Sequence, residues 1–158
     1  METQYITNFG IKTEIAKIKV RYVLYARKST ESDEKQALSI ESQVKEMLSI
    51  ADRDNLEVVD IRRESHSAKE SGQRPVFKEL LDDVRRGRYT GILTWAPDRL
   101  SRNEIYASTI TYLVRTGVIH DLKFASYNFD NSPEGIMMLQ LALSQSQYFS
   151  SKLGKDVR

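Results

Sequence analysis

The chain has 158 residues, 40% of them hydrophobic and 29% charged, a composition that suits one ordinary folded domain with a sizeable core. It contains no cysteine and two histidines, so a disulfide framework and a thiolate or histidine-rich metal site are excluded, and we expect no cofactor. The net charge of +2 is too small to identify a nucleic-acid binder. Without a membrane-spanning apolar run or a signal-peptide pattern, we expect a cytoplasmic protein with no membrane partner.

The first strand and helix are predicted after an N-terminal arm. Residues 1–19 show no clear core pattern, and we expect them to be flexible. Residues 20–26 (VRYVLYA) are β-branched and aromatic, which favours a buried strand. Residues 30–37 are polar and predict a loop, after which Ser39 can cap a helix. The apolar face of that helix would carry Ile40, Val44, Met47, Leu48 and Ala51.

The same order then repeats. Residues 57–61 (EVVDI) predict a second strand, and residues 62–73 predict a polar loop. A second helix is expected to begin near Pro75, which is favourable at a first helical position, and to end at Gly87. Its apolar stripe would be Val76, Phe77, Leu80, Leu81 and Val84.

A third repeat completes the predicted core. Residues 91–96 (GILTWA) predict a strand, residues 103–116 a helix, and residues 122–125 a fourth strand. The stripe of this helix would contain Ile105, Ile110, Leu113 and Val114. Alternating strands and helices predict an α/β core over residues 20–132, with a mostly parallel sheet, right-handed crossovers and a three-layer flavodoxin-like or resolvase-like arrangement.

A long helix is predicted to start near residue 133 and to be cut by the chain end. Its apolar residues are too many for one face of a solvated helix: Ile136, Met137, Met138, Leu139, Leu141, Ala142 and Leu143. Either part of this surface meets a second subunit, or the helix packs between the sheet and a neighbouring helix. The end of the segment is basic, and its candidate DNA contacts are Lys152, Lys155 and Arg158.

Polar side chains follow three of the predicted strands, where ligands gather in open parallel sheets. Arg27 and Ser29 close the first strand and, being two residues apart, can project the same way. Arg74 ends the loop after the second strand. The third strand is followed by Asp98, Arg99 and Arg102, and the two arginines would share one face at a helix start. Three loops would therefore bring four arginines toward one serine hydroxyl.

Four guanidinium groups around a hydroxyl favour phosphoryl transfer, because planar permanent cations bind the developing charge on phosphate oxygens. Acyl transfer would need a histidine base, and neither His66 nor His120 sits in a G-x-S-x-G motif, which is absent. Nucleotide binding has no support, since the chain lacks both G-x-x-x-x-G-K-[ST] and G-x-G-x-x-G. A single loop arginine is usually a solvated charge, so the combination carries the prediction.

Four ordered motifs resemble the resolvase/invertase catalytic domain of serine site-specific recombinases. They are YARKST (residues 25–30), Gln43, SGQRP (residues 71–75) and PDRLSR (residues 97–102). The resemblance runs from about Val20 to the chain end. The last two motifs look more like those of large serine recombinases and transposon recombinases than those of small resolvases.

The resemblance implies a serine nucleophile. Ser29 would attack a DNA phosphodiester, form a 5′-phosphoserine link and free a 3′-hydroxyl, without metal or ATP. Arg27, Arg99 and Arg102 would bind the scissile phosphate and stabilise its transition state. Arg74 would contribute to the same cluster.

The resemblance also implies supporting residues. Asp98 would orient the arginines or take part in proton transfer, and Gln43 would support the site from the first helix. Glu64 and Ser67 fall near positions that are acidic and hydroxylic in the family, although this loop differs in length. Small resolvases place a lysine on the helix after the arginine of this loop, where Asp83 stands here, so no lysine role is carried over.

The partners implied are duplex DNA carrying a recombination site, a second copy in a homodimer, and a synaptic homotetramer in which strands are exchanged and religated. We expect site selection to depend on C-terminal DNA-binding parts outside this chain, with residues 133–158 as the start of a dimerisation or linker helix. Integration, excision, inversion and transposition all stay open as outcomes. Two alternatives remain: a non-catalytic dimerising module of the same fold, and an arginine-rich α/β domain that binds a small phosphate ester.

Overall fold

The computed structural model describes residues 19–28, 38–65, 74–100 and 104–156, with side chains as far as Ser144. Its four strands are β1 (Arg21–Arg27), β2 (Glu57–Glu64), β3 (Gly91–Thr94) and β4 (Asp121–Lys123). Its helices are α2 (Ile40–Arg53), α3 (Pro75–Arg85), α4 (Pro97–Leu100), α5 (Glu104–Arg115) and α6 (Pro133–Asp156).

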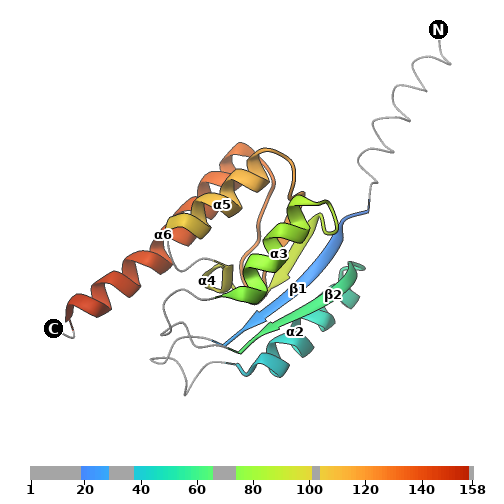
Figure 1. Cartoon of the computed structure of the whole chain (residues 1–158), viewed down its shortest axis with the longest axis horizontal. Helices are drawn as coiled ribbons and strands as arrows, with labels where there is room; N and C mark the ends of the chain where they lie inside the picture. The colour runs from blue at the N-terminus through green and yellow to red at the C-terminus, as the bar shows by residue number, and fades with distance from the viewer. Residues whose placement is uncertain (1–18, 29–37, 66–73, 101–103, 157–158) are drawn as a thin grey trace, which may run out of the picture.

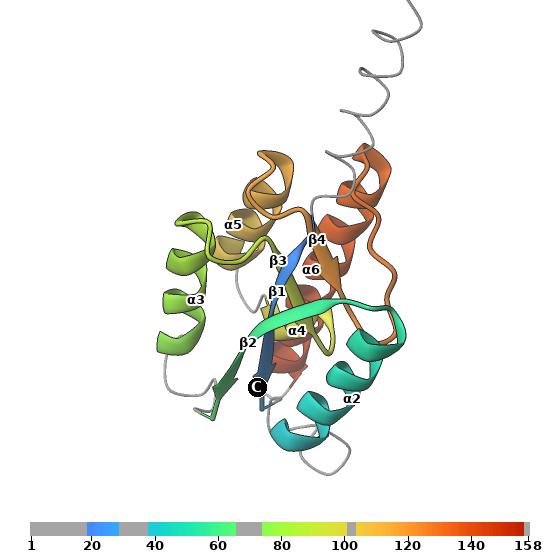
Figure 2. The ribbon, with the colours of Figure 1, turned by 90° about the vertical axis from the view of Figure 1, so that its right-hand side faces the viewer.

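The strands form one parallel sheet in the order β2-β1-β3-β4, which lies between two layers of helices. Helix α2 covers one face, and α3, α4, α5 and α6 lie on the other (Figures 1 and 2). The predicted α/β fold with a mostly parallel sheet is confirmed. Chain order reverses between β1 and β3. In open parallel sheets, ligands bind beyond the carboxyl ends of the strands at such a point.

Strand β1 divides the core because its side chains alternate between the two faces. Tyr22, Leu24 and Ala26 pack toward α2, whereas Val23 and Tyr25 pack toward α3, α5 and α6. All five are buried because helices cover both faces, which explains the continuous apolar run in the sequence. The same alternation directs the next side chain of β1, that of Arg27, toward the face that carries α3 and α4.

Local signals set several helix boundaries as predicted. The Ser39 hydroxyl accepts a hydrogen bond from the Ser42 amide at 3.1 Å and so caps α2. Pro75 opens α3, and Gly87 follows its end with φ of +82°, a conformation that favours glycine. Both helices begin where predicted, and α3 ends just before Gly87.

Strand β2 and the segment after β3 differ from the prediction. Strand β2 continues through Glu64, with Arg62, Arg63 and Glu64 paired to Tyr25, Ala26 and Arg27, so the predicted loop from residue 62 was wrong at its start. Strand β3 ends at Thr94 and is followed by the one-turn helix α4. Charged residues are tolerated in β2 because it is an edge strand, open on one side.

Two predicted core residues face outward. Leu48 on α2 is 38% exposed and Ile105 on α5 is 73% exposed, so the predicted apolar stripes were too wide. On α6, Leu139 and Leu143 are buried against the core, whereas Met137, Met138 and Leu141 are exposed. Among the described helices, none is both long and apolar enough to cross a membrane.

Candidate active site

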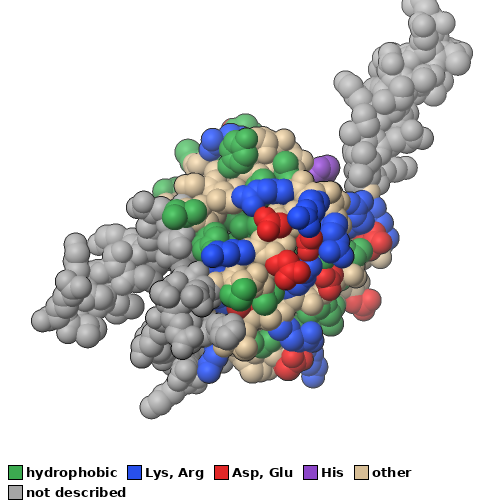
Figure 3. Space-filling model, viewed as in Figure 1, with side chains coloured by type: hydrophobic (Ala, Val, Ile, Leu, Met, Phe, Trp, Pro, Cys, Tyr) green, Lys and Arg blue, Asp and Glu red, His purple; other side chains and the backbone are tan. Residues whose placement is uncertain are grey.

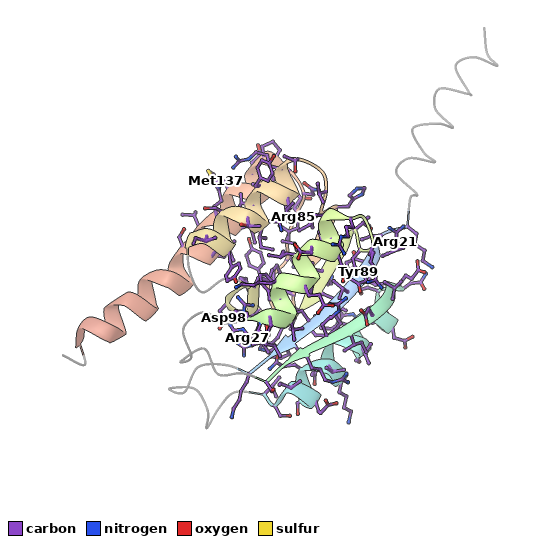
Figure 4. All side chains as sticks on the ribbon, viewed as in Figure 1. Arg21, Arg27, Arg85, Tyr89, Asp98 and Met137 are labelled. Atoms are coloured by element: carbon purple, nitrogen blue, oxygen red, sulfur yellow. The ribbon has the colours of Figure 1, made fainter. Side chains whose placement is uncertain are left out.

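The predicted site residues that the structure describes meet where β1 and β3 end. Arg27 is the last residue of β1 and only 1% exposed, although it carries a full charge. Its Nη2 donates to the Asp98 carbonyl at 2.5 Å and its Nε to the Arg99 carbonyl at 3.3 Å. Figure 4 shows Arg27 and Asp98 next to each other at this edge of the sheet. The first strand is thereby fixed to α4.

A second buried arginine binds the same end of α4. Arg74, 3% exposed, donates from Nη2 to the Arg99 carbonyl at 2.5 Å and from Nη1 to the Leu100 carbonyl at 2.9 Å. The last carbonyls of a helix have no partners within it and form its negative end. Two guanidinium groups therefore converge on the carboxyl end of α4, and Arg99 accepts hydrogen bonds from both.

Aromatic rings enclose the Arg74 guanidinium. Its central carbon lies 4.1 Å from the centre of the Phe77 ring, 5.3 Å from that of Tyr106 and 5.4 Å from that of Tyr25. Cations are attracted to the faces of aromatic rings, and the attraction is stronger when water is excluded. Arg74 is thus held from three sides and turned toward α4.

Glu64 joins this cluster from the end of β2, and its side chain is fully buried. Its carboxylate accepts hydrogen bonds from the Val76 amide at 2.9 Å and the Phe77 amide at 3.2 Å, which are free donors in the first turn of α3. It also accepts the Tyr25 hydroxyl at 2.6 Å and lies 4.0 Å from Arg74 Nε. Arg74, the residue at the N-cap of α3, makes no side-chain cap. Glu64, at the end of β2, caps this helix instead.

Asp98 and Arg99 carry polar atoms that have no partner. Arg99 is 5% exposed, and its Nη1 donates to Asp98 Oδ2 at 2.9 Å. Its Nε is buried without a hydrogen-bond acceptor, and so is Asp98 Oδ1 without a donor. Buried polar groups are nearly always satisfied in folded proteins, so such atoms together indicate a place for a ligand. The donor and the acceptor left over both belong to α4.

Gln43 connects the two ends of the segment that carries Ser29. Its Nε2 donates to the Arg27 carbonyl at 2.9 Å and to the Leu38 carbonyl at 3.1 Å. Residue 27 precedes that segment and residue 38 follows it, so one fully buried amide holds both ends. The Gln43 Oε1 atom is the remaining buried side-chain atom without a partner in the described part of the chain.

The structure brings six of the predicted site residues together, and it does not describe the side chains of the others. The six are Arg27, Gln43, Glu64, Arg74, Asp98 and Arg99. Those outside the described residues are Ser29, Ser67, Arg102 and Arg158. Lys152 and Lys155 belong to α6, but their side chains are not among those described. Arg99 belongs to the short helix α4, and the expectation that it shares a face with Arg102 lies outside the described residues.

Asp83, at the position where small resolvases have a lysine, belongs to a separate network. It accepts Arg62 Nη2 at 2.5 Å, while Arg62 Nε contacts Asp60 at 3.1 Å. The Tyr89 hydroxyl bonds to both Asp60 and Arg62. Figure 3 shows basic and acidic side chains interleaved on this face of the molecule. We call Asp60, Arg62, Asp83 and Tyr89 the α3 network. None of them is among the six site residues that meet where β1 and β3 end.

Sequence reasoning missed Tyr25, whose hydroxyl lies between Glu64 and Arg74. It accepts Arg74 Nη2 at 3.0 Å while donating to Glu64. Burial is the largest cause that raises its pKa well above the ordinary value, so the hydroxyl keeps its proton. The available signal was the spacing of two between Tyr25 and Arg27, which puts both on one face of β1. We call Tyr25, Glu64 and Arg74 the α4 network.

Comparison with known proteins identifies the family. The sequence profile of the family described as "Resolvase, N terminal domain" matches residues 22–158. The chain belongs to the resolvase family of serine recombinases. It is 30% identical over 131 residues to a Bacillus subtilis (strain 168) protein named "Putative DNA recombinase", matching 82% of this chain and 25% of the relative. The resolvase-family chain thus spans about a quarter of that relative's length.

Solved structures support the same fold for this resolvase-family domain. The N-terminal catalytic domain of TP901-1 integrase matches with a TM-score of 0.60 at 24% identity, covering 85% of this chain and 98% of that one. A resolvase family site-specific recombinase from Streptococcus pneumoniae matches with a TM-score of 0.58 at 19% identity, covering 89% and 100%. The predicted resolvase-like fold is confirmed.

Proposed function

We propose that this chain is the catalytic domain of a site-specific DNA recombinase in which Ser29 is the nucleophile. The Ser29 Oγ atom bonds to the scissile phosphorus, the bond to the 3′-oxygen breaks, and the serine proton leaves while the 3′-oxygen gains one. The products are a 5′-phosphoserine ester and a 3′-hydroxyl. Attack of a new 3′-hydroxyl on the ester reseals the strand, and because the ester conserves the backbone bond energy, no ATP is needed. In this proposal the arginines, and no metal ion, stabilise the charge on the phosphate.

The observation that carries this proposal is the buried Arg99 Nε, an N–H donor without an acceptor, beside two arginines anchored on main-chain carbonyls. A donor held in advance at the place where charge develops stabilises the transition state without reorganising. A phosphate oxygen would supply the missing acceptor. Family membership and the position of Arg27 two residues before Ser29 support the same assignment.

The remaining site residues divide into ligands and supports. Arg27, Arg99 and Arg102 contact the phosphate, and Arg74 contributes by holding α4. Asp98 orients Arg99, and its unpartnered Oδ1 is available as a proton acceptor. The supports are Gln43, which holds both ends of the segment that carries Ser29, Glu64, which caps α3, and Ser67, which follows β2 in the sequence.

The proposed partners are duplex DNA and further copies of the chain. Exposed apolar side chains lie on α5 and α6, among them Ile105, Tyr112, Met137, Met138 and Leu141. A groove of about 430 Å³ between these helices has a mostly polar lining that includes Thr111, Arg115 and Gln140. The exposed apolar side chains favour a homodimer that pairs into a synaptic tetramer. The basic residues Lys152, Lys155 and Arg158 would contact DNA phosphates in a salt-dependent way.

The proposal is tested by trapping the covalent intermediate. The protein in its full length is mixed with nicked duplexes that carry its crossover site, so that the cleaved strand cannot be resealed. We expect a protein–DNA adduct whose linkage maps to Ser29 by peptide mass analysis. The matched variant Ser29→Ala should bind the duplex equally well and form no adduct.

Other outcomes assign the chain differently. If sites are bound and paired but no adduct forms, the chain is a non-catalytic dimerising module. If a generic phosphate ester is turned over while duplex DNA is not trapped, it is a domain for small phosphate esters. An adduct that persists in Ser29→Ala would contradict the assignment of the nucleophile.

The homodimer is tested on the exposed surface of α6. Leu141→Lys places a charge among apolar side chains and should shift the protein from dimer to monomer in light scattering, because burying an unpaired ammonium group is costly. Lys45→Leu on α2, at an exposed position on the opposite layer, serves as the control and should leave the mass unchanged. Equal masses for the wild type and Leu141→Lys would exclude this surface.

A further inference from the structure

The α4 network centres on the Tyr25 hydroxyl, which joins three elements of the fold. Tyr25 comes from β1, Glu64 from β2, and Arg74 from the start of α3. The hydroxyl donates to Glu64 Oε1 at 2.6 Å and accepts Arg74 Nη2 at 3.0 Å. One proton thus fixes the direction of both hydrogen bonds, and Tyr25 is fully buried, so water does not compete for either.

Arg74 transmits this arrangement to α4. The guanidinium of Arg74 donates to the Tyr25 hydroxyl, and its Nη atoms also donate to the carbonyls of Arg99 and Leu100. A helix of one turn has little internal hydrogen bonding, so contacts from outside set its position. Without the hydroxyl, the fork of donors on Arg74 would lose one of its fixed acceptors and could rotate away from α4.

Two side-chain atoms that lack a hydrogen-bond partner depend on α4 for their position. Arg99 Nε and Asp98 Oδ1 both project from this helix. Movement of α4 by a fraction of an ångström would displace the donor from the phosphate, and small misplacements of catalytic groups reduce rates strongly. The hydroxyl of Tyr25 therefore acts on the site indirectly, through Arg74.

We propose that Tyr25 is a positioning residue, whose hydroxyl holds Arg74 and, through it, the carboxyl end of α4 in the place where Arg99 binds phosphate. This inference rests on the proposed recombinase function and adds a residue to it. Burial and the hydrogen bond to Glu64 keep the hydroxyl protonated across the working range of pH, so it stays a donor to the carboxylate.

The molecule contains a matched control, Tyr89 of the α3 network. Tyr89 is also buried, donates its hydroxyl to a carboxylate, Asp60, at 2.5 Å, and accepts an arginine, Arg62, at 3.0 Å. The difference is that Arg62 then binds carboxylates, whereas Arg74 binds α4. Figure 4 shows Tyr89 well separated from Arg27 and Asp98. Tyr25→Phe and Tyr89→Phe each remove one oxygen and keep the ring.

The test compares both variants in the adduct assay on the full-length protein, at protein concentrations that saturate the DNA. We expect Tyr25→Phe to form the Ser29 adduct about 10- to 100-fold more slowly, the effect of one hydrogen bond to a charged group. Tyr89→Phe should slow adduct formation less than about twofold, because the α3 network does not hold α4. DNA affinity should be unchanged in both, which separates positioning from substrate binding.

A double-mutant cycle shows whether Tyr25 acts through Arg74. Arg74→Lys keeps the charge but cannot hold Tyr25 and two carbonyls together. If the hydroxyl acts through the guanidinium, Tyr25→Phe should cost little more in the Arg74→Lys background. Additive losses would overturn the inference, as would equal rates for Tyr25→Phe and Tyr89→Phe, or a Tyr25→Phe chain that does not fold. No adduct in the wild type would instead overturn the proposed function.

Discussion

The α4 network and the α3 network use the same three kinds of side chain for different ends. In each, a buried tyrosine hydroxyl donates to a carboxylate and accepts an arginine Nη2 at 3.0 Å. In the α3 network the arginine, Arg62, forms ion pairs with Asp60 and Asp83. In the α4 network the arginine, Arg74, lies 4.0 Å from the nearest carboxylate and binds main-chain carbonyls instead.

This difference separates a structural cluster from a functional one. Carboxylates neutralise Arg62, and none of the described atoms of the α3 network is buried without a partner. Main-chain carbonyls of α4 accept the Nη donors of Arg74, one carboxylate, that of Glu64, lies 4.0 Å away, and unpartnered atoms remain on the same helix at Asp98 and Arg99. A preorganised N–H donor that has no acceptor within the protein can serve an incoming anion. Arginine content alone would not distinguish the two clusters.

The largest expected effect comes from removing Arg99. Arg99→Ala deletes the unpartnered Nε donor, and loss of one preorganised donor reduces transition-state stabilisation by about 3 to 4 kcal/mol. We expect adduct formation to fall about 100- to 1000-fold, below detection in an ordinary gel assay. The fold should stay intact, because Arg99 is held by its main chain while its side chain contacts Asp98.

The control for Arg99→Ala is Arg88→Ala, which removes an exposed arginine that contacts Asp83 at 3.4 Å. It should leave adduct formation unchanged, because Arg88 belongs to neither α4 nor the ends of the central strands. Cleavage by Arg99→Ala at the wild-type rate would contradict the role given to the α4 atoms. A loss of equal size in both variants would show that the assay responds to net charge, as DNA binding does.

Sequence patterns predicted the features of the site that depend on local signals. The run of β-branched and aromatic residues at 20–26 predicted a buried strand and so placed Arg27 at its end, and Ser39 marked the start of α2. The alternating elements predicted the parallel sheet, and the position of its carboxyl ends then followed from topology. These features require no knowledge of which side chains meet across the fold.

The parts that sequence could not predict depend on long-range contacts with the main chain. A helix of one turn, such as α4, has no periodicity to detect, and carbonyls as partners of Arg74 leave no residue type to recognise. Glu64 caps α3 from the end of β2, twelve residues before Val76, whose amide it accepts, so no capping pattern appears at the helix start. Arg62 was placed in a loop for the same reason, since Tyr25, its pairing partner on β1, and the carboxylate of Asp83 are both distant in sequence.

A smaller effect, on stability rather than catalysis, is expected from removing Arg62. Arg62→Ala removes an ion-pair partner from Asp60 and Asp83, and the loss of the pair with Asp83, which has little solvent exposure, is destabilising. The midpoint of thermal unfolding should fall by several degrees at pH 7, while the folded variant should form the Ser29 adduct at the wild-type rate. A slower reaction with an unchanged midpoint would show that the α3 network serves the site.

Acid should remove this difference in stability. The hydrogen bond from Arg62 is the largest cause that lowers the pKa of Asp83 below its ordinary value of 3.8 in the folded state. A lowered pKa contributes stability that is present above the unfolded value and is lost as pH falls through the folded one. The midpoints of the wild type and Arg62→Ala should therefore converge as pH falls below about 4, the range in which free carboxyl groups take up protons. Scanning calorimetry from pH 7 to pH 3 measures this convergence, and parallel curves would show that Arg62 stabilises the fold by packing on Tyr89 instead of by ion pairing.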